Sequence, residues 1–412
     1  SNFIITATEN SDLSLIATTT PEGYERYIAQ NDALARLFTR VEMKIPSMGD
    51  IQQIVADESV KMERASNVKI GYDAITTAIQ LSEKYTTDRT MPDKALDLIR
   101  ESVSYVSKQK VRVVDALVVS TIVSERIGVN VGVLTEDEKR KLMDLELEMK
   151  KRIVGQDKAI KAVARAMKAE RMGIRDDSKP IASFLFAGPT GVGKTEVART
   201  LARIWFGGEE QMTRLDMSEY QEEENIKRLI GYKTESGYYE EGYLTGAVRG
   251  RPFGLILLDE MEKANPRVLD LFLQILDEGR LKDGLNRDTN YKSCVIIATS
   301  NIGSKTIADN IEGKDFGQIE KLVKSELNDS FRIEFLNRFD DVIVFKPLSK
   351  DDIRKIAYIM LNLKAKKLKE KGYNLEITNE LVNKVAEEGY SPIWGARELK
   401  RVIDNEVNNL IS

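Results

Sequence analysis

The chain has 412 residues, 42% of them hydrophobic and 31% charged, with a formal net charge of −4, so we expect an ordinary soluble globular protein of two or three domains. No apolar run reaches the length of a membrane span, no secretory signal opens the chain, and a pI near 5.5 gives no electrostatic footprint for nucleic acid. The lack of histidine excludes His-based metal sites, and the single cysteine, Cys294, excludes a disulfide framework and fits a reducing, cytosol-like compartment.

The first 45 residues carry two β-rich segments, at residues 3–6 and 13–19, and a short helical stretch at residues 22–37. No nucleotide-binding loop precedes them, so these pieces cannot make a complete α/β domain. Because the chain lacks an initiator Met and its first residues are already strand-like, we expect it to start inside a longer protein. The pattern then turns helical, and helices are predicted at residues 48–62, 72–85 and 92–107.

A connector with a short helix at residues 114–126 follows, and it leads to a capping box formed by Thr135 and Glu138. The box opens a helix whose apolar residues share one face, namely Leu142, Leu145 and Met149. Beyond residue 153 strands alternate with helices, which argues for a parallel sheet covered by helices on both faces. The strands are predicted at residues 184–187, 213–215, 254–258 and 294–299, and one of the helices near residues 221–230.

The last part of the chain, after residue 348, has a helical pattern again. Ser349 and Asp352 form an N-cap at its start, and Gly372 would close the first helix. The apolar residues of that helix repeat at helical spacing: Ile353, Ile356, Ala357 and Met360.

The clearest motif is a phosphate-binding loop, in which two glycines flank four residues and Lys-Thr follows. It lies between an apolar strand and a helix, so that backbone N–H groups and the helix dipole point at the same anion. Lys194 would reach the terminal phosphates and the Thr195 hydroxyl would ligate Mg²⁺. The alternative is a glycine turn that only resembles such a loop. The motif predicts a nucleoside triphosphate site formed by Gly188, Pro189, Thr190, Gly191, Val192, Gly193, Lys194 and Thr195.

Two acids end the apolar strand at residues 255–258. At the carboxyl edge of a parallel sheet, Asp259 is placed to hold Mg²⁺, and Glu260 is the natural general base that polarises water for attack on the γ-phosphate. Asn301 follows a neighbouring strand and could orient that water. The simpler interpretations are that the acids cap the next helix and that Asn301 belongs to a turn.

These motifs, in this order, resemble the AAA+ ATPases and, within them, the Clp family of ring-forming protein unfoldases. The resemblance spans residues 151–412 and is carried by residues 154–157, 188–195, 215–220, 257–264, 299–301, 331–338 and 395–397. Two earlier stretches, residues 17–24 and 91–97, are similar to the end of the family's first ATPase module and its helical lid.

The resemblance implies an α/β fold, in which an AAA+ parallel-sheet nucleotide-binding domain flanked by helices carries a C-terminal helical lid subdomain. The end of a first AAA+ module and its helical lid would precede it. The expected boundaries are 1–45 for the remnant of the first large domain, 46–110 for its lid, 111–150 for a connector, 151–347 for the second large domain and 348–412 for its lid.

The resemblance also implies roles for single residues. Ile153 and Val154 would line the adenine pocket, Asn301 would be sensor one, and Arg397 would be sensor two, reaching from the lid to the phosphates. Arg338 would be the arginine finger that acts on the neighbouring subunit's nucleotide, which requires a ring, hexameric in this family. The alternative for Arg338 is a surface salt bridge to Asp340 or Asp341.

The sequence departs from the family at the pore loop, where an aromatic residue in a Gly-Tyr-Val-Gly context grips the polypeptide. Tyr238 is the best candidate here, with Tyr232 as the competing assignment and a tyrosine-rich surface hairpin as the alternative. In the first module, where family members often show two adjacent arginines before a Phe, this chain keeps Arg36 alone. The long coiled-coil insertion of the disaggregase branch is missing too, because residues 93–109 run almost directly into the connector.

We therefore expect a Mg²⁺-dependent ATPase, a homo-oligomeric unfoldase or disaggregase-type chaperone that threads unfolded or aggregated polypeptide through a ring pore in the cytoplasm or an organelle equivalent. Its alternatives are a regulatory ATPase of a Clp-type protease and, less favoured, a nucleic-acid remodeller. A ClpP-type peptidase is not expected as a partner, because residues 302–319 lack the apolar-Gly-apolar tripeptide that docks on such a protease. Neither nucleic acid nor membrane is expected as a partner.

Overall fold

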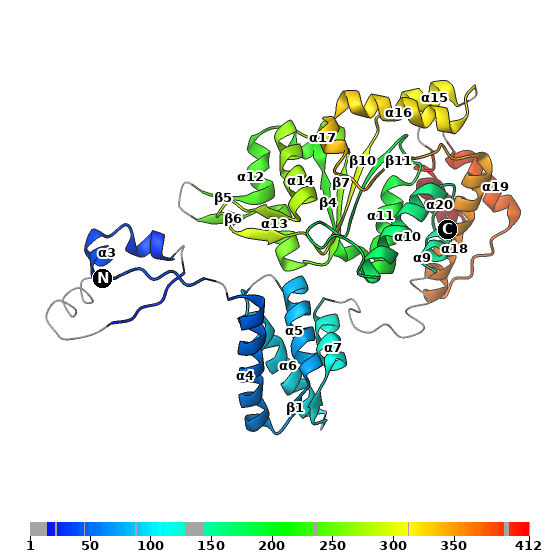
Figure 1. Cartoon of the computed structure of the whole chain (residues 1–412). Coiled ribbons are helices and arrows are strands. Elements are labelled where there is room, and N and C mark those ends of the chain that lie inside the picture. The colour runs from blue at the N-terminus through cyan, green and yellow to red at the C-terminus, as the bar shows by residue number, and fades with distance from the viewer. Residues whose placement is uncertain are drawn as a thin grey trace. The chain divides into compact units, whose positions relative to one another are not determined.

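The structure is a computed structural model, and it describes residues 15–20, 23–44, 46–86, 89–109, 111–127, 144–234, 238–311, 313–390 and 395–411. Its contacts divide the chain into two units, Ser1–Ile51 and Gln52–Ser412, and each is considered by itself (Figure 1). Among the described residues, no helix combines the length and the apolar character that crossing a bilayer would need.

The first unit holds two short helices, a π-helix (Tyr24–Ile28) and α3 (Asp32–Leu37). Asn31 separates them, and its side chain caps α3 by accepting hydrogen bonds from the N–H groups of Ala33 and Leu34. The expected helical stretch is thus confirmed as two pieces. The strand predicted at residues 13–19 is wrong where it is described, because residues 15–20 form no strand with any described part of the chain. Residues 3–6 lie outside the described part of the chain.

The second unit begins with a helical bundle. Its helices are α4 (Met48–Ser66, which starts in the first unit), α5 (Tyr72–Tyr85), α6 (Asp93–Lys108) and α7 (Ala116–Ile127). The predicted helices are confirmed, and α5 has the predicted bounds. Two strands of two residues each, β1 (Lys69–Ile70) and β2 (Val113–Val114), pair in parallel and were not predicted, because two residues show no alternation.

Two helices then lead into the sheet, α9 (Leu145–Lys150) and α10 (Asp157–Arg171). Leu145 and Met149 are fully buried, which confirms that they share the inward face of their helix. The capping box of Thr135 and Glu138, together with Leu142, lies outside the described residues.

The centre of this unit is a five-stranded, wholly parallel sheet. The strand order is β11 (Asp341–Val344), β3 (Ala182–Ala187), β10 (Cys294–Ser300), β7 (Gly254–Asp259) and β4 (Met212–Asp216). The four strands predicted from the sequence are confirmed. The edge strand β11 was not predicted, since it begins with Asp341 directly after Asp340 and leaves an apolar run of only three residues within the strand.

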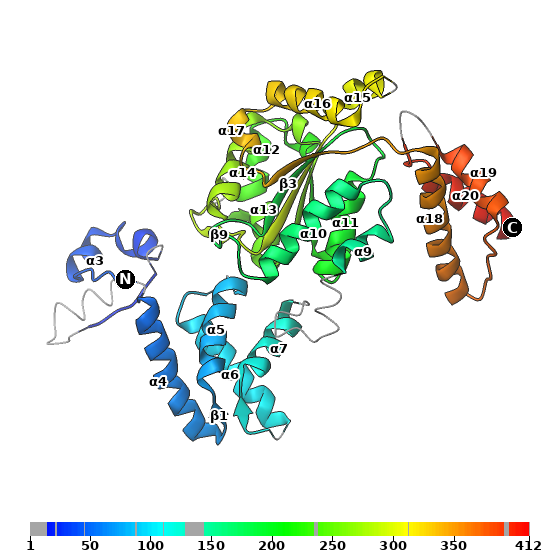
Figure 2. The same cartoon turned by 45° about the vertical axis from the view of Figure 1, so that its right-hand side comes forward.

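Helices cover both faces of the sheet, as expected. Figures 1 and 2 show α10 and α11 (Lys194–Trp205) on one face and α14 (Pro266–Glu278) on the other. The inner side of α14 carries Val268, Phe272 and Ile275, which pack in one core with the strand residues that point towards them. The remaining helices are α12 (Glu224–Ile230), α13 (Tyr243–Gly250), α15 (Ser304–Asn310), α16 (Phe316–Ser330) and α17 (Ile333–Leu336).

Two antiparallel hairpins extend from this layer. The first joins β5 (Gly231–Lys233) to β6 (Tyr239–Glu241), and the second joins β8 (Arg280–Lys282) to β9 (Asp288–Asn290). Gly284, in the second hairpin, approaches the first so closely that an added Cβ would lie 2.1 Å from the carbonyl oxygen of Gly231. A side chain at this position would push the two hairpins apart.

The C-terminal helices are α18 (Lys350–Glu370), α19 (Asn379–Gly389) and α20 (Leu399–Ile411), and they enclose a separate small core. The N-cap of α18 is confirmed as a reciprocal capping box, in which the Ser349 hydroxyl and N–H both donate to the Asp352 carboxylate and the Asp352 N–H donates back to the hydroxyl. Gly372 has a φ of +88° and ends the helix as predicted.

Candidate active site

The phosphate-binding loop leaves β3 at its carboxyl end and enters α11. Three of its glycines have left-handed φ angles, +133° at Gly188, +73° at Gly191 and +104° at Gly193, which L side chains rarely adopt. The loop is anchored to the neighbouring strand, because the N–H of Gly188 donates to the carbonyl of Ser300 at 3.2 Å. The resulting turn leaves the free N–H groups at the start of α11 available to an anion.

Lys194 is the buried cation of this loop, with 7% of its surface exposed. Its ammonium donates to the carbonyls of Gly188 and Pro189 and, at 2.9 Å, to the Asn301 side-chain oxygen. Burial lowers the pKa of Lys194 to about 8, against the opposing pull of nearby carboxylates, of which Glu262 is the strongest. Because so little water solvates this ammonium, a charge-assisted hydrogen bond to a phosphate would stabilise its charged form.

Asp259 ends β7 and is largely buried, with 13% of its side chain exposed. One carboxylate oxygen, Oδ1, accepts a hydrogen bond from the Thr299 hydroxyl at 2.5 Å. The other, Oδ2, is ion-paired with the Arg214 guanidinium at 2.6 Å. Both oxygens at the position expected to hold Mg²⁺ therefore have protein partners.

Glu260 turns the chain sharply out of the strand. Its backbone is left-handed, with φ 58° and ψ 52°, a conformation that costs a non-glycine residue free energy and that concentrates at functional sites. The N–H of Glu260 donates to the Thr299 hydroxyl at 3.2 Å, which fixes the turn to β10. The carboxylate lies 2.5 Å from the ammonium of Lys263.

Asn301 joins the loop to the acids. Its side-chain oxygen accepts from Lys194, its side-chain nitrogen donates to Glu260 at 3.4 Å, and its backbone N–H donates to Glu262 at 3.0 Å. The structure therefore brings Lys194, Asn301 and Glu260 into one hydrogen-bonded row at the carboxyl edge of the sheet. Four residues of this network were given no site role from the sequence, because their contacts depend on sheet register or on the tight turn: Arg214, Glu262, Lys263 and Thr299. The last three lie in stretches that carry the family resemblance.

Residues on either side of the loop in the sequence, Gln156 and Ala396, bond to it. Ile153 is buried, and the nearby Gln156 amide, 4% exposed, donates to the carbonyl of Val192 in the loop. From the C-terminal lid, the N–H of Ala396 donates to the carbonyl of Gly191 at 3.2 Å. Arg397 follows directly, but its side chain is exposed and makes no hydrogen bond or ion pair with residues that the structure describes. Val154 is half-buried beside Ile153.

Three protein-family models match the chain. They are described as AAA lid domain, matching residues 47–141, AAA domain (Cdc48 subfamily), matching residues 179–342, and C-terminal, D2-small domain, of ClpB protein, matching residues 348–412.

The chain is 36% identical to the ATP-dependent Clp protease ATP-binding subunit ClpA homolog of Cyanidium caldarium, over 98% of this chain and 56% of that protein. It is 35% identical to the chaperone protein ClpB of Oceanobacillus iheyensis, over 100% of this chain and 60% of that protein. Among solved structures, a closed-state reconstruction of Hsp104 with ATPγS and FITC casein matches with a TM-score of 0.88 and 34% identity, over 100% of this chain and 72% of that chain. The chain belongs to the Clp family of AAA+ ATPases. It spans 56% and 60% of the length of these two curated relatives.

Arg338 of this Clp chain lies two residues after the end of α17 and is not part of the hydrogen-bonded row. Its guanidinium pairs with Asp277 of α14 at 2.8 Å and, more loosely, with Glu334 at 3.9 Å. The surface salt bridge considered as its alternative is thus present, but with these acids and not with the expected ones. Asp340 accepts hydrogen bonds from the N–H and hydroxyl of Ser183, and Asp341 faces Arg165 at 4.0 Å.

The side chains of the two candidate pore-loop tyrosines of this Clp chain differ in hydrogen bonding and in exposure. Tyr232 is tied down, since its hydroxyl donates to Glu240 across the first hairpin at 2.7 Å. Tyr238 is 77% exposed, and only its backbone carbonyl takes part in closing the hairpin, by accepting from Thr234 at 2.8 Å. Of the two, Tyr238 therefore has the more exposed aromatic side chain.

Asp259 and Thr195 suit a Mg²⁺ ion that is held mainly by nucleotide phosphates. No cluster of three acidic, His or Cys ligands exists among the described residues, but Mg²⁺ at such sites keeps waters and takes only one or two carboxylates. The oxygen Oε2 of Glu262 is buried and has no hydrogen-bond partner in the described part of the chain. An acceptor left open beside Asp259 fits a hydrated cation.

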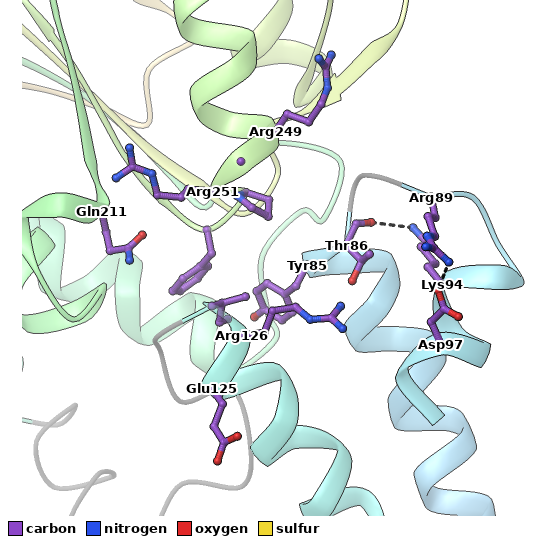
Figure 3. Close-up of a pocket in the computed structure, with 14 residues that line it drawn as sticks. Tyr85, Thr86, Arg89, Lys94, Asp97, Glu125, Arg126, Gln211, Arg249 and Arg251 are labelled. Carbon is purple, nitrogen blue, oxygen red and sulfur yellow. Dashed lines mark hydrogen bonds and ion pairs between the residues drawn. The ribbon is translucent and has the colours of Figure 1, made fainter. Parts of the chain in front are cut away.

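A cavity of about 590 Å³ in this Clp chain lies apart from the loop, among α5, α6, α7 and the turn after α13. Figure 3 shows Arg89, Lys94 and Asp97 gathered on one side of it. Arg89 is ion-paired with Asp97, and Lys94 donates to the carbonyl of Thr86. Because these groups already satisfy one another, we assign no ligand to this cavity.

Proposed function

We propose that this chain binds and hydrolyses ATP with Mg²⁺ at the loop described above, and that the energy drives the threading of polypeptide through a ring. The observation that carries the proposal is the hydrogen-bonded row from Lys194 through Asn301 to Glu260. This row supports the proposal, because it brings an ammonium, an amide and a carboxylate together at one edge of the sheet, where they could serve as phosphate-binding cation, water-orienting group and base.

Nucleotide binding follows from the loop and its neighbours. The N–H groups of residues 188–195 and the Lys194 ammonium would bind the phosphates, with Ile153 and Val154 beside the adenine. Thr195 and Asp259 would hold Mg²⁺, which supplies electrostatic stabilisation of the phosphate charge. On binding, the Lys194 ammonium would exchange the loop carbonyls it contacts now for phosphate oxygens.

Hydrolysis needs a base and a means of neutralising developing charge. Glu260 would take a proton from the attacking water, and Asn301, already hydrogen-bonded to Glu260, would orient that water. Arg397 from the lid and Arg338 from the neighbouring subunit would stabilise the charge that develops on the γ-phosphate. In this proposal Arg338 leaves Asp277, its partner in the isolated chain, or reaches past it.

We further propose the domain division expected above: the end of a first ATPase module with its lid (1–45 and 46–110), a connector (111–150), and a complete second module with its lid (151–347 and 348–412). A finger acting in trans requires a homo-oligomer, and the hexamer of the family is the expected ring. The expected location is the cytoplasm or an organelle stroma or matrix, with neither nucleic acid nor membrane as a partner.

Polypeptide is the proposed substrate, with Tyr238 as the gripping residue. Support comes from the exposed Tyr238 side chain and from the similar Hsp104 structure, which was solved with casein. An aromatic ring grips diverse chains by apolar contact and needs no specific sequence.

A second candidate is a regulatory ATPase of a Clp-type protease, since some relatives bear that name. One feature favours a free-standing remodeller instead. Among the described residues, the segment after Asn301 is mostly taken up by α15 and α16, with Ile307 and Ile319 buried in the core, and the short connection between the two helices exposes a single large apolar side chain, Ile311. Degradation of a model substrate by this chain with a ClpP-type peptidase would favour the second candidate.

The test of the site separates binding from hydrolysis. Glu260→Gln should bind ATP nearly as wild type does but hydrolyse it about 10²- to 10⁴-fold more slowly, because it removes the base and leaves the phosphate contacts. Lys194→Ala should instead lose affinity about tenfold or more, because a phosphate loses its charged partner. Calorimetry and steady-state hydrolysis measure the two effects. Wild-type hydrolysis by Glu260→Gln would contradict the assignment.

A further inference from the structure

Arg214 is a basic residue in direct contact with the proposed metal site. It lies on β4, whose register with β7 places Arg214 opposite Leu257 and Asp216 opposite Asp259. Side chains alternate along a strand, so Arg214 and Asp259 share one face of the sheet on neighbouring strands, two residues out of step. Only a long side chain spans that offset, and the Arg214 guanidinium reaches Oδ2 of Asp259 at 2.6 Å.

The ion pair with Arg214 stabilises the charged Asp259 carboxylate, which would be costly to keep in this largely buried position without a cationic partner. Asp259 is only 13% exposed, and its Oδ1 receives a neutral hydroxyl from Thr299. Without Arg214 the negative charge would have no cationic partner among its hydrogen-bonded neighbours, which is costly for a group so little hydrated. Arg214 itself is 48% exposed, so it can leave the carboxylate at a modest desolvation cost.

We propose that Arg214 is the counter-ion of Asp259 in the metal-free state and yields the carboxylate to Mg²⁺ when nucleotide enters, so that Arg214 sets how strongly nucleotide binding depends on Mg²⁺. This deepens the proposed function and rests on it. A guanidinium and a magnesium ion compete for the same carboxylate and repel each other at close range.

The surroundings of Arg214 offer the released guanidinium other partners. A cavity of about 660 Å³ opens beside it at the edge of β4, lined by Arg228 and by four carboxylates, Asp216, Glu219, Glu240 and Glu241. Of the four, Glu240 already accepts from Tyr232 and Glu241 pairs with Arg249. Arg214 would therefore exchange one carboxylate for another when it leaves Asp259, so it need not be left with water alone. A purely structural salt bridge would affect stability but would not change the effect of the metal.

The experiment compares the affinity of a fluorescent ADP analogue, mant-ADP, in excess Mg²⁺ and in EDTA. In EDTA, the Arg214→Gln variant should bind mant-ADP more weakly, because Asp259 has lost its counter-ion and repels the phosphates. In excess Mg²⁺ it should bind at least as tightly as wild type, because no guanidinium competes with the metal for Asp259. The ratio of the two affinities should therefore rise about threefold to fivefold over wild type. Arg214→Lys should change it less, because the charge is kept.

Arg280→Gln is the matched control. Arg280 forms a comparable ion pair with Glu278 at 2.9 Å on β8, so its loss changes the net charge equally and should leave the ratio unchanged. A ratio for Arg214→Gln equal to or below that of wild type overturns the proposal. If Arg214→Gln does not fold, the same ratio is measured for Arg214→Lys: a smaller rise above wild type supports the proposal, and no rise overturns it.

A second measurement needs no nucleotide. In EDTA, the Arg214→Gln substitution should lower the unfolding temperature when it is introduced into wild type but not when it is introduced into Asp259→Asn, because the asparagine has no charge to balance. Equal losses in the two backgrounds would overturn the pairing. If wild type binds no mant-ADP, the proposed function fails and the metal part of this proposal fails with it, while the unfolding data still decide whether Arg214 and Asp259 stabilise each other.

Discussion

Asp283 shows how one residue can hold two elements together. Its side chain is fully buried in the second hairpin, and its carboxylate pairs with Arg249 of α13 and with Arg287. Arg249 also pairs with Glu241 of the first hairpin, and the Arg287 guanidinium lies 5.1 Å from the Tyr239 ring centre. The hairpin that carries Tyr238 is therefore held through ion pairs that depend on one buried anion.

Asp283 should make the free energy of unfolding depend on pH in the acidic range. Burial alone would raise the pKa of Asp283, but hydrogen bonds from Arg287, Arg249 and backbone N–H groups outweigh it and lower the pKa to about 2. Because the folded pKa lies below the unfolded value, near 3.9, the stabilisation is complete above about pH 4 and is lost as pH falls towards 2.

Asp283→Asn should therefore lower the free energy of unfolding by about 3 kcal/mol at pH 7, and the difference from wild type should shrink between about pH 4 and 2. Denaturant unfolding at several pH values measures this. Asp288→Asn, an exposed residue on β9, is the control and should change stability little. An Asp283→Asn protein as stable as wild type at pH 7 would contradict the account.

At the scale of elements, the first hairpin carries Tyr238, the residue proposed to grip the polypeptide substrate. One tyrosine of this hairpin is bonded across the strands and the other is exposed at its end. The second hairpin is followed in the chain by β10, which ends at Ser300 and leads directly to Asn301 of the nucleotide site.

Tyr238→Ala should spare basal ATP hydrolysis but slow the unfolding of a tagged substrate about fivefold to tenfold, which corresponds to the loss of one aromatic contact. Tyr232→Ala is the control, since its ring is engaged with Glu240 and should contribute less to grip. Substrate unfolding by fluorescence loss gives the readout. If Tyr232→Ala stops unfolding and Tyr238→Ala does not, the pore-loop assignment is wrong.

Elements with long or regular patterns could be predicted from the sequence. The helix α5 has the predicted bounds, and the strands β3, β7 and β10 were found because buried parallel strands are apolar runs. The strand β4 is only partly buried and was found from its place in the alternation of strands and helices. Short elements could not be predicted, since β1, β2 and β11 have two to four residues. The strand expected at residues 13–19 failed because β-rich composition does not supply a partner strand.

The candidate site divides in the same way. The loop and Asp259, Glu260 and Asn301 could be named because each follows a strand in a contiguous motif. Arg214 could not, because its contact with Asp259 depends on which strand lies beside β7 and in what register. The left-handed backbone of Glu260 also has no signal in the sequence, since glutamate rarely adopts it.

At the scale of the whole molecule, the account requires that subunits complete one another's sites. Arg338 is about 39% exposed at its side chain and pairs with residues of its own α14 and α17. If it acts on a neighbour, two inactive variants should complement each other. Mixing Arg338→Ala with Glu260→Gln in equal amounts should recover about a quarter of wild-type hydrolysis, the statistical share of interfaces with an intact base and finger.

Steady-state ATP hydrolysis across mixing ratios checks this complementation. Each variant alone should be nearly inactive, and activity should peak near equal amounts. Activity that never exceeds that of the two parents would contradict action in trans between subunits.

The central claim, that ATP hydrolysis here serves polypeptide remodelling, is tested most directly by measuring which polymer stimulates the hydrolysis. The account predicts that unfolded casein raises the ATPase rate of the chain, that single-stranded DNA does not, and that Glu260→Gln abolishes the stimulation. Stimulation by single-stranded DNA and not by casein would contradict it.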